Sequence, residues 1–97
     1  MKLPAILLYA LFSTGLAYAG DMQSGRETYE LHCSICHGAN GIAVDMTIPS
    51  FANGDRLFQM DQDLVRSIRE GKDLMPAFRG LLSDREIRDV ISYLRSL

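Results

Sequence analysis

Tryptophan is absent from the 97 residues, and cysteine, histidine and lysine each occur only twice. The two cysteines, Cys33 and Cys36, lie so close together that a disulfide between them would close a very short loop and stabilise the fold little. Basic residues are not in excess, since Lys and Arg total 10 and Asp and Glu total 12. This balance makes nucleic acid an implausible partner. A lysine ring for steering acidic partners is also excluded, because Lys2 and Lys72 are the only lysines.

The long hydrophobic run of the chain lies at its start. Lys2 is followed by an apolar stretch from Leu3 to Phe12 and then by small residues ending in Ala17-Tyr18-Ala19. This order is typical of a secretory signal peptide cleaved after Ala19, although an uncleaved membrane anchor is the alternative. We therefore expect residues 1–19 to be a signal peptide, residues 20–97 to form one domain, and the mature protein to reside in the periplasm.

The segment Cys33-Ser34-Ile35-Cys36-His37 reads C-x-x-C-H, the attachment signature of c-type haem. Two thiols three residues apart can each bond to one vinyl group of the same porphyrin, and His37 can then coordinate the iron. A domain as small as residues 20–97 usually needs a cross-link or a bound group to stabilise its small core. One covalently attached haem would provide that stabilisation.

Two other interpretations of this cysteine pair stay open. A C-x-x-C pair can form a dithiol redox centre or half of a zinc site. A structural zinc site wants about four protein ligands, and beyond this motif the chain offers only His32, which we expect to be an exposed residue at a helix end. A thioredoxin-like centre would want alternating strands and helices, which the sequence does not show.

Two helices are expected in the first part of the mature chain. The first should run from about Gly25 to Cys33, behind a capping box formed by Ser24 and Glu27. The second should have Asp61 as its N-cap and end at Gly71, a residue type favoured just past a helix end.

The clearest helix signal lies at the C-terminus. Ser83 and Glu86 form a second capping box. Glycine and proline mark residues 38–53 and 72–82 as loops, and no strand pair, repeat or low-complexity segment is recognisable. The sequence therefore predicts an all-α fold with three main helices. The last helix has apolar residues at i, i+3, i+4 and i+7: Ile87, Val90, Ile91 and Leu94.

The second axial position on the iron has four methionine candidates. Met22 lies near the new N-terminus, Met46 lies only nine positions after His37, and Met60 directly precedes a predicted helix. Met75 has the best setting, because it lies in a loop after a helix end and is followed by a proline that fixes the chain. We expect His37 and Met75 to be the axial ligands.

Together these residues resemble a small class I cytochrome c, of the bacterial c5- or c551-like kind. The similarity covers Ser24–Leu97. It rests on the haem motif, on the segment Met75-Pro76-Ala77-Phe78 after a glycine-ended helix, and on the C-terminal helix that ends in Tyr93-Leu94. The resemblance implies a small cytochrome c fold, with three main helices around one covalently attached haem and with the N- and C-terminal helices crossing.

The resemblance also implies roles for residues outside the haem motif. Gly25 and Tyr29 of the first helix would meet Val90 and Tyr93 of the last, with the glycine permitting close approach. Pro49 would offer its carbonyl oxygen to the free ring nitrogen of the haem-ligating histidine and so fix the orientation of the ring.

The expected function is that of a periplasmic monohaem c-type cytochrome, a one-electron carrier and not an enzyme. Its cofactor would be one haem c with its iron, attached through Cys33 and Cys36 and ligated by His37 and Met75. Its partners would be periplasmic redox proteins, with transient docking to a membrane complex, and the chain is expected to be a monomer. The alternatives are an open-site haem enzyme or gas sensor, and a dedicated haem subunit or maturation factor of a larger periplasmic redox enzyme.

Overall fold

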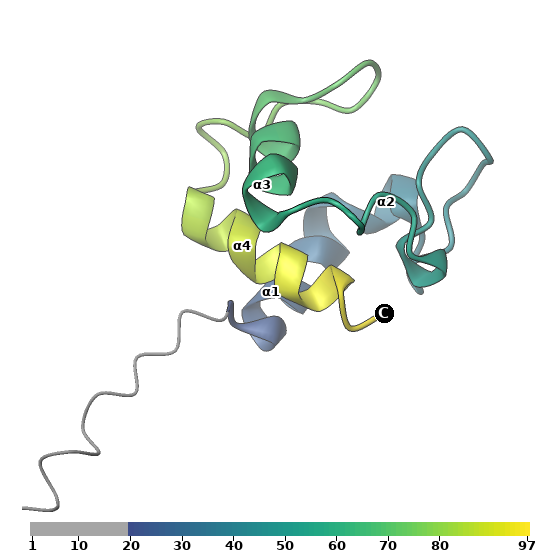
Figure 1. The fold of residues 1–97 in the computed structure, drawn as a ribbon, viewed down its shortest axis with the longest axis horizontal. Coiled ribbons are helices and arrows are strands. Elements are labelled where there is room, and N and C mark those ends of the chain that lie inside the picture. The colour runs from purple at the N-terminus through teal and green to yellow at the C-terminus, as the bar shows by residue number, and fades with distance from the viewer. Residues whose placement is uncertain (1–19) are drawn as a thin grey trace, which may run out of the picture.

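The computed structural model describes residues 20–97, so the signal peptide predicted at residues 1–19 lies outside the described residues. Figure 1 shows α4 lying across α1, with α3 beside α4. A short 3₁₀-helix, η2, interrupts the long connection between α2 and α3. The elements are α1 (Met22–His32), α2 (Ser34–His37), η2 (Phe51–Asn53), α3 (Asp61–Glu70) and α4 (Asp84–Leu94).

Helix α1 begins three residues earlier than its sequence pattern predicts. Its N-cap is Asp21, whose carboxylate accepts hydrogen bonds from the backbone N–H groups of Gln23 and Ser24, at 3.0 and 3.2 Å. Ser24 therefore lies inside the first turn, and the predicted capping box of Ser24 with Glu27 is wrong. The physical reason is that Asp21, an equally good cap, stands three residues earlier, so the helix begins before Ser24 and leaves it no end to cap.

The crossing of α1 and α4 depends on a glycine. A Cβ atom on Gly25 would lie 1.9 Å from the carbonyl oxygen of Asp89, so the two backbones could not approach this closely with any other residue there. One turn further along α1, the ring of Tyr29 packs against that of Tyr93, with the centroids 5.3 Å apart. Val90 is buried in the same cluster. The predicted contact of these four residues is confirmed.

Helices α3 and α4 have the predicted limits with one difference. Ser83 caps α4, and the side chain of Glu86 returns a hydrogen bond to the backbone of Ser83, so this capping box is confirmed. Helix α3 ends before Gly71, which has a φ of 77°. At its start, Asp61 is the first helical residue and the N-cap is Met60, which offers no side-chain cap.

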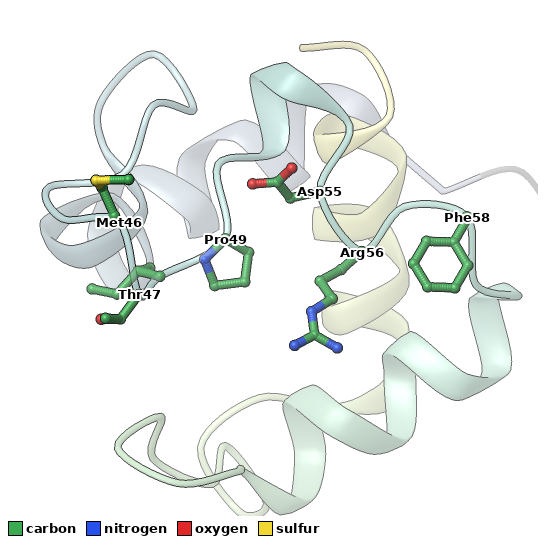
Figure 2. Close-up of a pocket in the computed structure, with 7 residues that line it drawn as sticks. Met46, Thr47, Pro49, Asp55, Arg56 and Phe58 are labelled. Carbon is green, nitrogen blue, oxygen red and sulfur yellow. The ribbon is translucent and has the colours of Figure 1, made fainter.

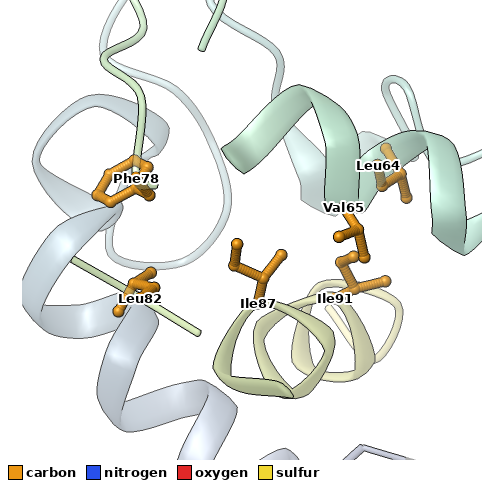
Figure 3. Packing of buried hydrophobic residues seen from close by; sticks show 6 residues of the cluster. All are labelled: Leu64, Val65, Phe78, Leu82, Ile87 and Ile91. Carbon is orange, nitrogen blue, oxygen red and sulfur yellow. The ribbon is translucent and has the colours of Figure 1, made fainter. Parts of the chain in front are cut away.

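The larger apolar cluster lies between α3, α4 and the chain that joins them. Figure 3 shows side chains from both helices converging on this region. Residues 20–97 form no β-strand, and their β-bridges are limited to two isolated ones, between Lys72 and Met75 and between Arg79 and Leu82, which agrees with the all-α prediction. The buried members of the cluster are Leu64, Val65, Phe78, Leu82, Ile87 and Ile91.

None of the helices formed by residues 20–97 is long and apolar enough to cross a membrane.

Candidate functional site

The cysteine motif lies at the junction of the first two helices. Cys33 ends α1 and precedes α2, and its carbonyl oxygen accepts the backbone N–H of His37 at 2.9 Å. One short helical turn therefore holds Cys33, Cys36 and His37 together. Cys33 is half-buried and Cys36 is exposed, and the two sulfurs are not joined in a disulfide.

Burial changes the chemistry of the inner cysteine. It raises the pKa of the Cys33 thiol to about 11, and the nearby Cys36 adds a smaller effect in the same direction. A dithiol redox centre works through an exposed thiolate with a lowered pKa. The environment of Cys33 is the opposite, so the geometry does not favour that alternative. A zinc site is not favoured either, because within residues 20–97 no three His, Cys, Asp or Glu side chains are placed to share a metal ion.

The ring of His37 is held from two sides. Its Nδ1 atom lies 2.9 Å from the carbonyl oxygen of Pro49, and its face stacks on Phe51 with the ring centroids 4.5 Å apart. His37 is buried, with 8% of its surface exposed. Because Nδ1 donates to Pro49, the acceptor nitrogen is Nε2, which is the atom that can bind a metal.

The backbone after His37 is fixed by α1. The hydroxyl group of Tyr29 donates a hydrogen bond of 2.6 Å to the carbonyl oxygen of Gly38. Burial raises the pKa of Tyr29 to about 12, so this donor keeps its proton at neutral pH. Gly38 has a φ of 89°, and a Cβ there would lie 1.8 Å from the carbonyl oxygen of Ile42. The histidine is therefore followed by a turn that only glycine can make.

Met75 lies in a tight turn that follows α3. Its N–H donates to the carbonyl oxygen of Lys72 at 2.8 Å, and its own carbonyl accepts the N–H of Lys72 at 3.0 Å. The side chain is half-buried against the larger apolar cluster. The other candidates are exposed: Met22 by 53%, Met60 by 65% and Met46 completely.

His37 and Met75 line one cavity. Every other lining side chain is apolar or aromatic except that of Cys33. These residues fit haem c, because a flat apolar macrocycle needs apolar walls, and because imidazole and thioether are the donors that c-type haem iron takes. Helices α1, α3 and α4 and the connection after α2 all contribute to the cavity, which is lined by Tyr29, Cys33, His37, Phe51, Ile68, Met75, Val90 and Leu94.

Sequence reasoning missed two contacts around this site. Phe51 stacks on His37, but a lone aromatic residue in a loop carries no periodic signal. His32 is not the exposed helix-end residue that we expected. It is half-buried, and its ring packs edge-on against Phe78 with the centroids 6.1 Å apart. The contact joins the end of α1 to the segment that follows Met75.

Comparison with known proteins agrees with this arrangement. Residues 20–94 match the sequence family described as cytochrome c oxidase, cbb3-type, subunit III. Cytochrome c6 of Gracilaria tenuistipitata var. liui is 32% identical over 98 residues, which cover 91% of each chain. Cytochrome c6 of Thermosynechococcus vestitus is 31% identical over 93% of this chain and 83% of that protein.

Solved structures show the same fold. Cytochrome c6 from the diatom Phaeodactylum tricornutum superposes with a TM-score of 0.62 at 31% identity, covering 79% of this chain and 93% of that one. KustC0563, a c-type cytochrome, superposes with a TM-score of 0.64 at 26% identity, covering 74% and 94% of the two chains.

Proposed function

This chain belongs to the cytochrome c family, in the group described as cytochrome c oxidase, cbb3-type, subunit III, and we propose that it is a periplasmic one-electron carrier with a His- and Met-ligated haem iron. It is a small monohaem cytochrome that transports electrons rather than an enzyme, and its haem c is covalently bound. The haem, when bound, would supply one-electron chemistry between Fe(III) and Fe(II).

The observation that carries the proposal is that Cys33, His37 and Met75 line one apolar cavity. In this proposal Cys33 and Cys36 hold the haem through thioether bonds. His37 would bind the iron through Nε2, because its Nδ1 is occupied by the Pro49 carbonyl. Met75 would bind from a turn whose two backbone hydrogen bonds limit its movement.

These residues would also tune the redox equilibrium. A thioether ligand favours Fe(II) and so raises the reduction potential. His37 and Met75 would stay bound in both oxidation states. The apolar lining would exclude water from the iron.

The decisive experiment compares two methionine variants. The oxidised wild-type protein should show the weak charge-transfer band of Met–Fe(III) at the red edge of the visible spectrum, and its reduced form should resist carbon monoxide. Met75→Ala should abolish the band, bind carbon monoxide and lower the potential. Met60→Ala is the matched control and should change neither property, because Met60 is 65% exposed.

Two results would contradict this proposal. Loss of the band in Met60→Ala but not in Met75→Ala would show that Met75 is not the iron ligand. Ready binding of carbon monoxide by the wild-type protein at neutral pH would show that the iron has an open position, as in the haem enzyme or gas sensor.

Export to the periplasm follows from the predicted signal peptide. Gly20, the first residue after the predicted cleavage point, packs on α4, where a Cβ would lie 2.5 Å from the hydroxyl oxygen of Ser92. Cleavage after Ala19 would therefore retain Gly20 at this contact. Mass spectrometry of the mature protein tests this: a retained leader would support the membrane-anchor alternative.

A second candidate function is that of a dedicated haem subunit. The observation that favours it is the description of the matched family, which names an oxidase subunit. Purification of the tagged protein under gentle conditions separates the two roles. A free carrier should elute as a monomer, whereas a subunit should elute with a larger redox enzyme in constant proportion.

A further inference from the structure

Asp89 carries the only buried carboxylate among residues 20–97. It lies on α4 at the crossing with α1, and only 8% of its surface is exposed. The other acidic side chains are within reach of water. Asp55, for example, lines a cavity at the surface beside Arg56, as Figure 2 shows. Burial of a charged carboxylate is costly unless a positive charge or several hydrogen bonds offset the loss of water.

Residues 20–97 supply Asp89 with little of that compensation. Its Oδ1 atom accepts the backbone N–H of Asp21 at 2.8 Å, whereas Oδ2 accepts no hydrogen bond from these residues. None of their lysine, arginine or histidine side chains lies within ion-pair distance of it. Because a carboxylate can accept about four hydrogen bonds, Asp89 has room for another donor, and a positively charged one would suit it best.

Gly20 lies beside this carboxylate. A Cβ atom on Gly20 would lie 2.5 Å from Oγ of Ser92 and 2.7 Å from the carbonyl oxygen of Arg88, so its backbone packs on the same part of α4. Consecutive backbone nitrogens are at most about 3.6 Å apart, which places the nitrogen of Gly20 within about 6.5 Å of Oδ1 of Asp89. Rotation of the glycine backbone can bring the two groups closer.

Removal of the predicted signal peptide would change the charge on this nitrogen. In the uncleaved chain the nitrogen belongs to the neutral amide between Ala19 and Gly20. A peptidase that hydrolyses this amide adds the hydroxyl group of water to the carbonyl carbon of Ala19 and leaves an amine on Gly20. The amine takes up a proton at neutral pH, because an α-amino group has a pKa of about 8. The result is an ammonium group with three N–H donors.

We propose that the α-ammonium group of Gly20, created by cleavage, binds the buried carboxylate of Asp89 and stabilises the crossing of α1 and α4 in the mature protein. The inference rests on the cleavage after Ala19 that is part of the proposed function. The surroundings suit an ammonium group, because Oγ of Ser92 and the carbonyl oxygen of Arg88 can accept its remaining N–H donors. The precursor has no charge at this position and lacks the ion pair.

The test compares holoproteins that begin at Gly20 or at Ala19. The extra alanine makes the Gly20 nitrogen a neutral amide again and moves the ammonium group one residue away. Each form is made with Asp89 and with Asp89→Asn, which keeps an oxygen for the N–H of Asp21. In urea unfolding near pH 7, the extra alanine should raise the unfolding equilibrium constant by about fivefold when Asp89 is present. In Asp89→Asn the two forms should differ by less than about twofold.

The pH dependence distinguishes an ion pair from an effect of chain length. Pairing raises the pKa of the ammonium group in the folded state, so its stabilisation is complete below the unfolded pKa of about 8 and is lost as the pH rises through the folded value. The difference between the Gly20 and Ala19 forms should therefore shrink between about pH 8 and pH 10. The neighbouring charged groups on α4, Arg85 and Arg88, and Asp21 before α1 are present in both forms, so their effects cancel.

Two results would overturn the pairing and leave the proposed electron transfer intact. One is an equal effect of the extra alanine with Asp89 and with Asp89→Asn. The other is a difference between the Gly20 and Ala19 forms that stays constant up to about pH 10. This second comparison uses only the wild-type side chains, so it is decisive even if Asp89→Asn does not fold. A native protein that begins at a residue other than Gly20 would instead overturn the predicted cleavage.

Discussion

The crossing of α1 and α4 and the segment from Gly38 to Met60 both line the same site, but they are held in place by different means. The crossing consists of regular helix and packs through buried side chains such as Tyr29, Val90 and Leu94. The segment has only one turn of 3₁₀-helix, and hydrogen bonds hold its backbone from outside. This difference shows that burial of apolar side chains holds the two helices together, whereas a few hydrogen bonds position the irregular segment at the haem site.

The test with the largest expected effect removes the two cysteines through which we propose that the haem is attached, at the junction of α1 and α2. Cys33→Ala combined with Cys36→Ala should abolish covalent haem and largely unfold residues 20–97, because so small a domain lacks another staple. A denaturing gel stained for haem peroxidase activity and a far-ultraviolet circular dichroism spectrum would check both effects. A double variant that keeps its native helix content would show that the domain folds without covalently attached haem.

The next test attacks the helix crossing. Gly25→Ala should lower the free energy of unfolding by about 3 kcal/mol, because the new Cβ would meet the Asp89 carbonyl oxygen at 1.9 Å and a backbone would have to move. Gly54→Ala is the control from the irregular segment. A Cβ there meets nothing within 4 Å, so only the strain of its φ of 82° remains, about 1–2 kcal/mol. Urea unfolding of both holoproteins gives the comparison, and equal losses would refute the importance of close backbone approach.

A third test loosens the irregular segment. Arg95 on the C-terminal side of α4 donates to the carbonyl oxygens of Leu57 and Gln59 at 2.7 and 2.9 Å, and pairs with Asp61 at 2.8 Å. Arg95→Ala should therefore cost about 1–2 kcal/mol. Arg66→Ala removes an exposed pair within α3 and should cost about 0.5 kcal/mol or less.

The same urea unfolding experiment checks the Arg95 prediction. In Arg95→Ala, the lower free energy of unfolding should be accompanied by faster hydrogen exchange at residues near Leu57 and Gln59 only. A loss as small as that of Arg66→Ala would mean that these contacts are as weak as an ordinary surface pair.

The smallest expected effect concerns pH. The backbone N–H of Ser24 is the main cause that lowers the pKa of Asp21, and the backbone N–H of Ser83 does the same for Glu86. Because the folded-state pKa values are lowered, both caps stabilise the protein above the ordinary carboxyl pKa, and this stability is lost as the pH falls through the folded values. Asp21→Asn keeps a cap that does not titrate.

The free energy of unfolding should therefore fall less steeply for Asp21→Asn than for the wild type between about pH 5 and pH 2. Urea titrations at a series of pH values measure both slopes. Parallel slopes would mean that the cap of Asp21 contributes nothing to acid sensitivity.

The sequence predicts the parts of this fold that have local signals. Ser83 and Glu86 stand at the spacing of a capping box, and the structure has that box. The contact of Gly25 with the last helix came from family resemblance, and it is confirmed. The local pattern misplaced the first cap, because Asp21 starts the helix three residues before Ser24 and caps Gln23 and Ser24 itself.

The rest depends on contacts between distant residues. Phe51 reaches His37, and Arg95 reaches Leu57, only after the chain has folded back on itself. Neither contact leaves a periodic pattern in the sequence. For the same reason the positive φ of Arg56 could not be predicted, because arginine carries no preference for that conformation.

The partnership of α1 with α4 has a consequence for the order of folding. The N–H of Asp21 bonds to the carboxylate of Asp89, and Gly25 is packed against the backbone of the same residue. Within residues 20–97, the start of α1 therefore lacks these contacts of Asp21 and Gly25 until α4 is complete. Bringing α1 and α4 together closes a loop of most of the domain, and contacts between residues so far apart in sequence form slowly. The cluster that Tyr29 forms with Val90 and Leu94 is therefore completed only after α4 has been made.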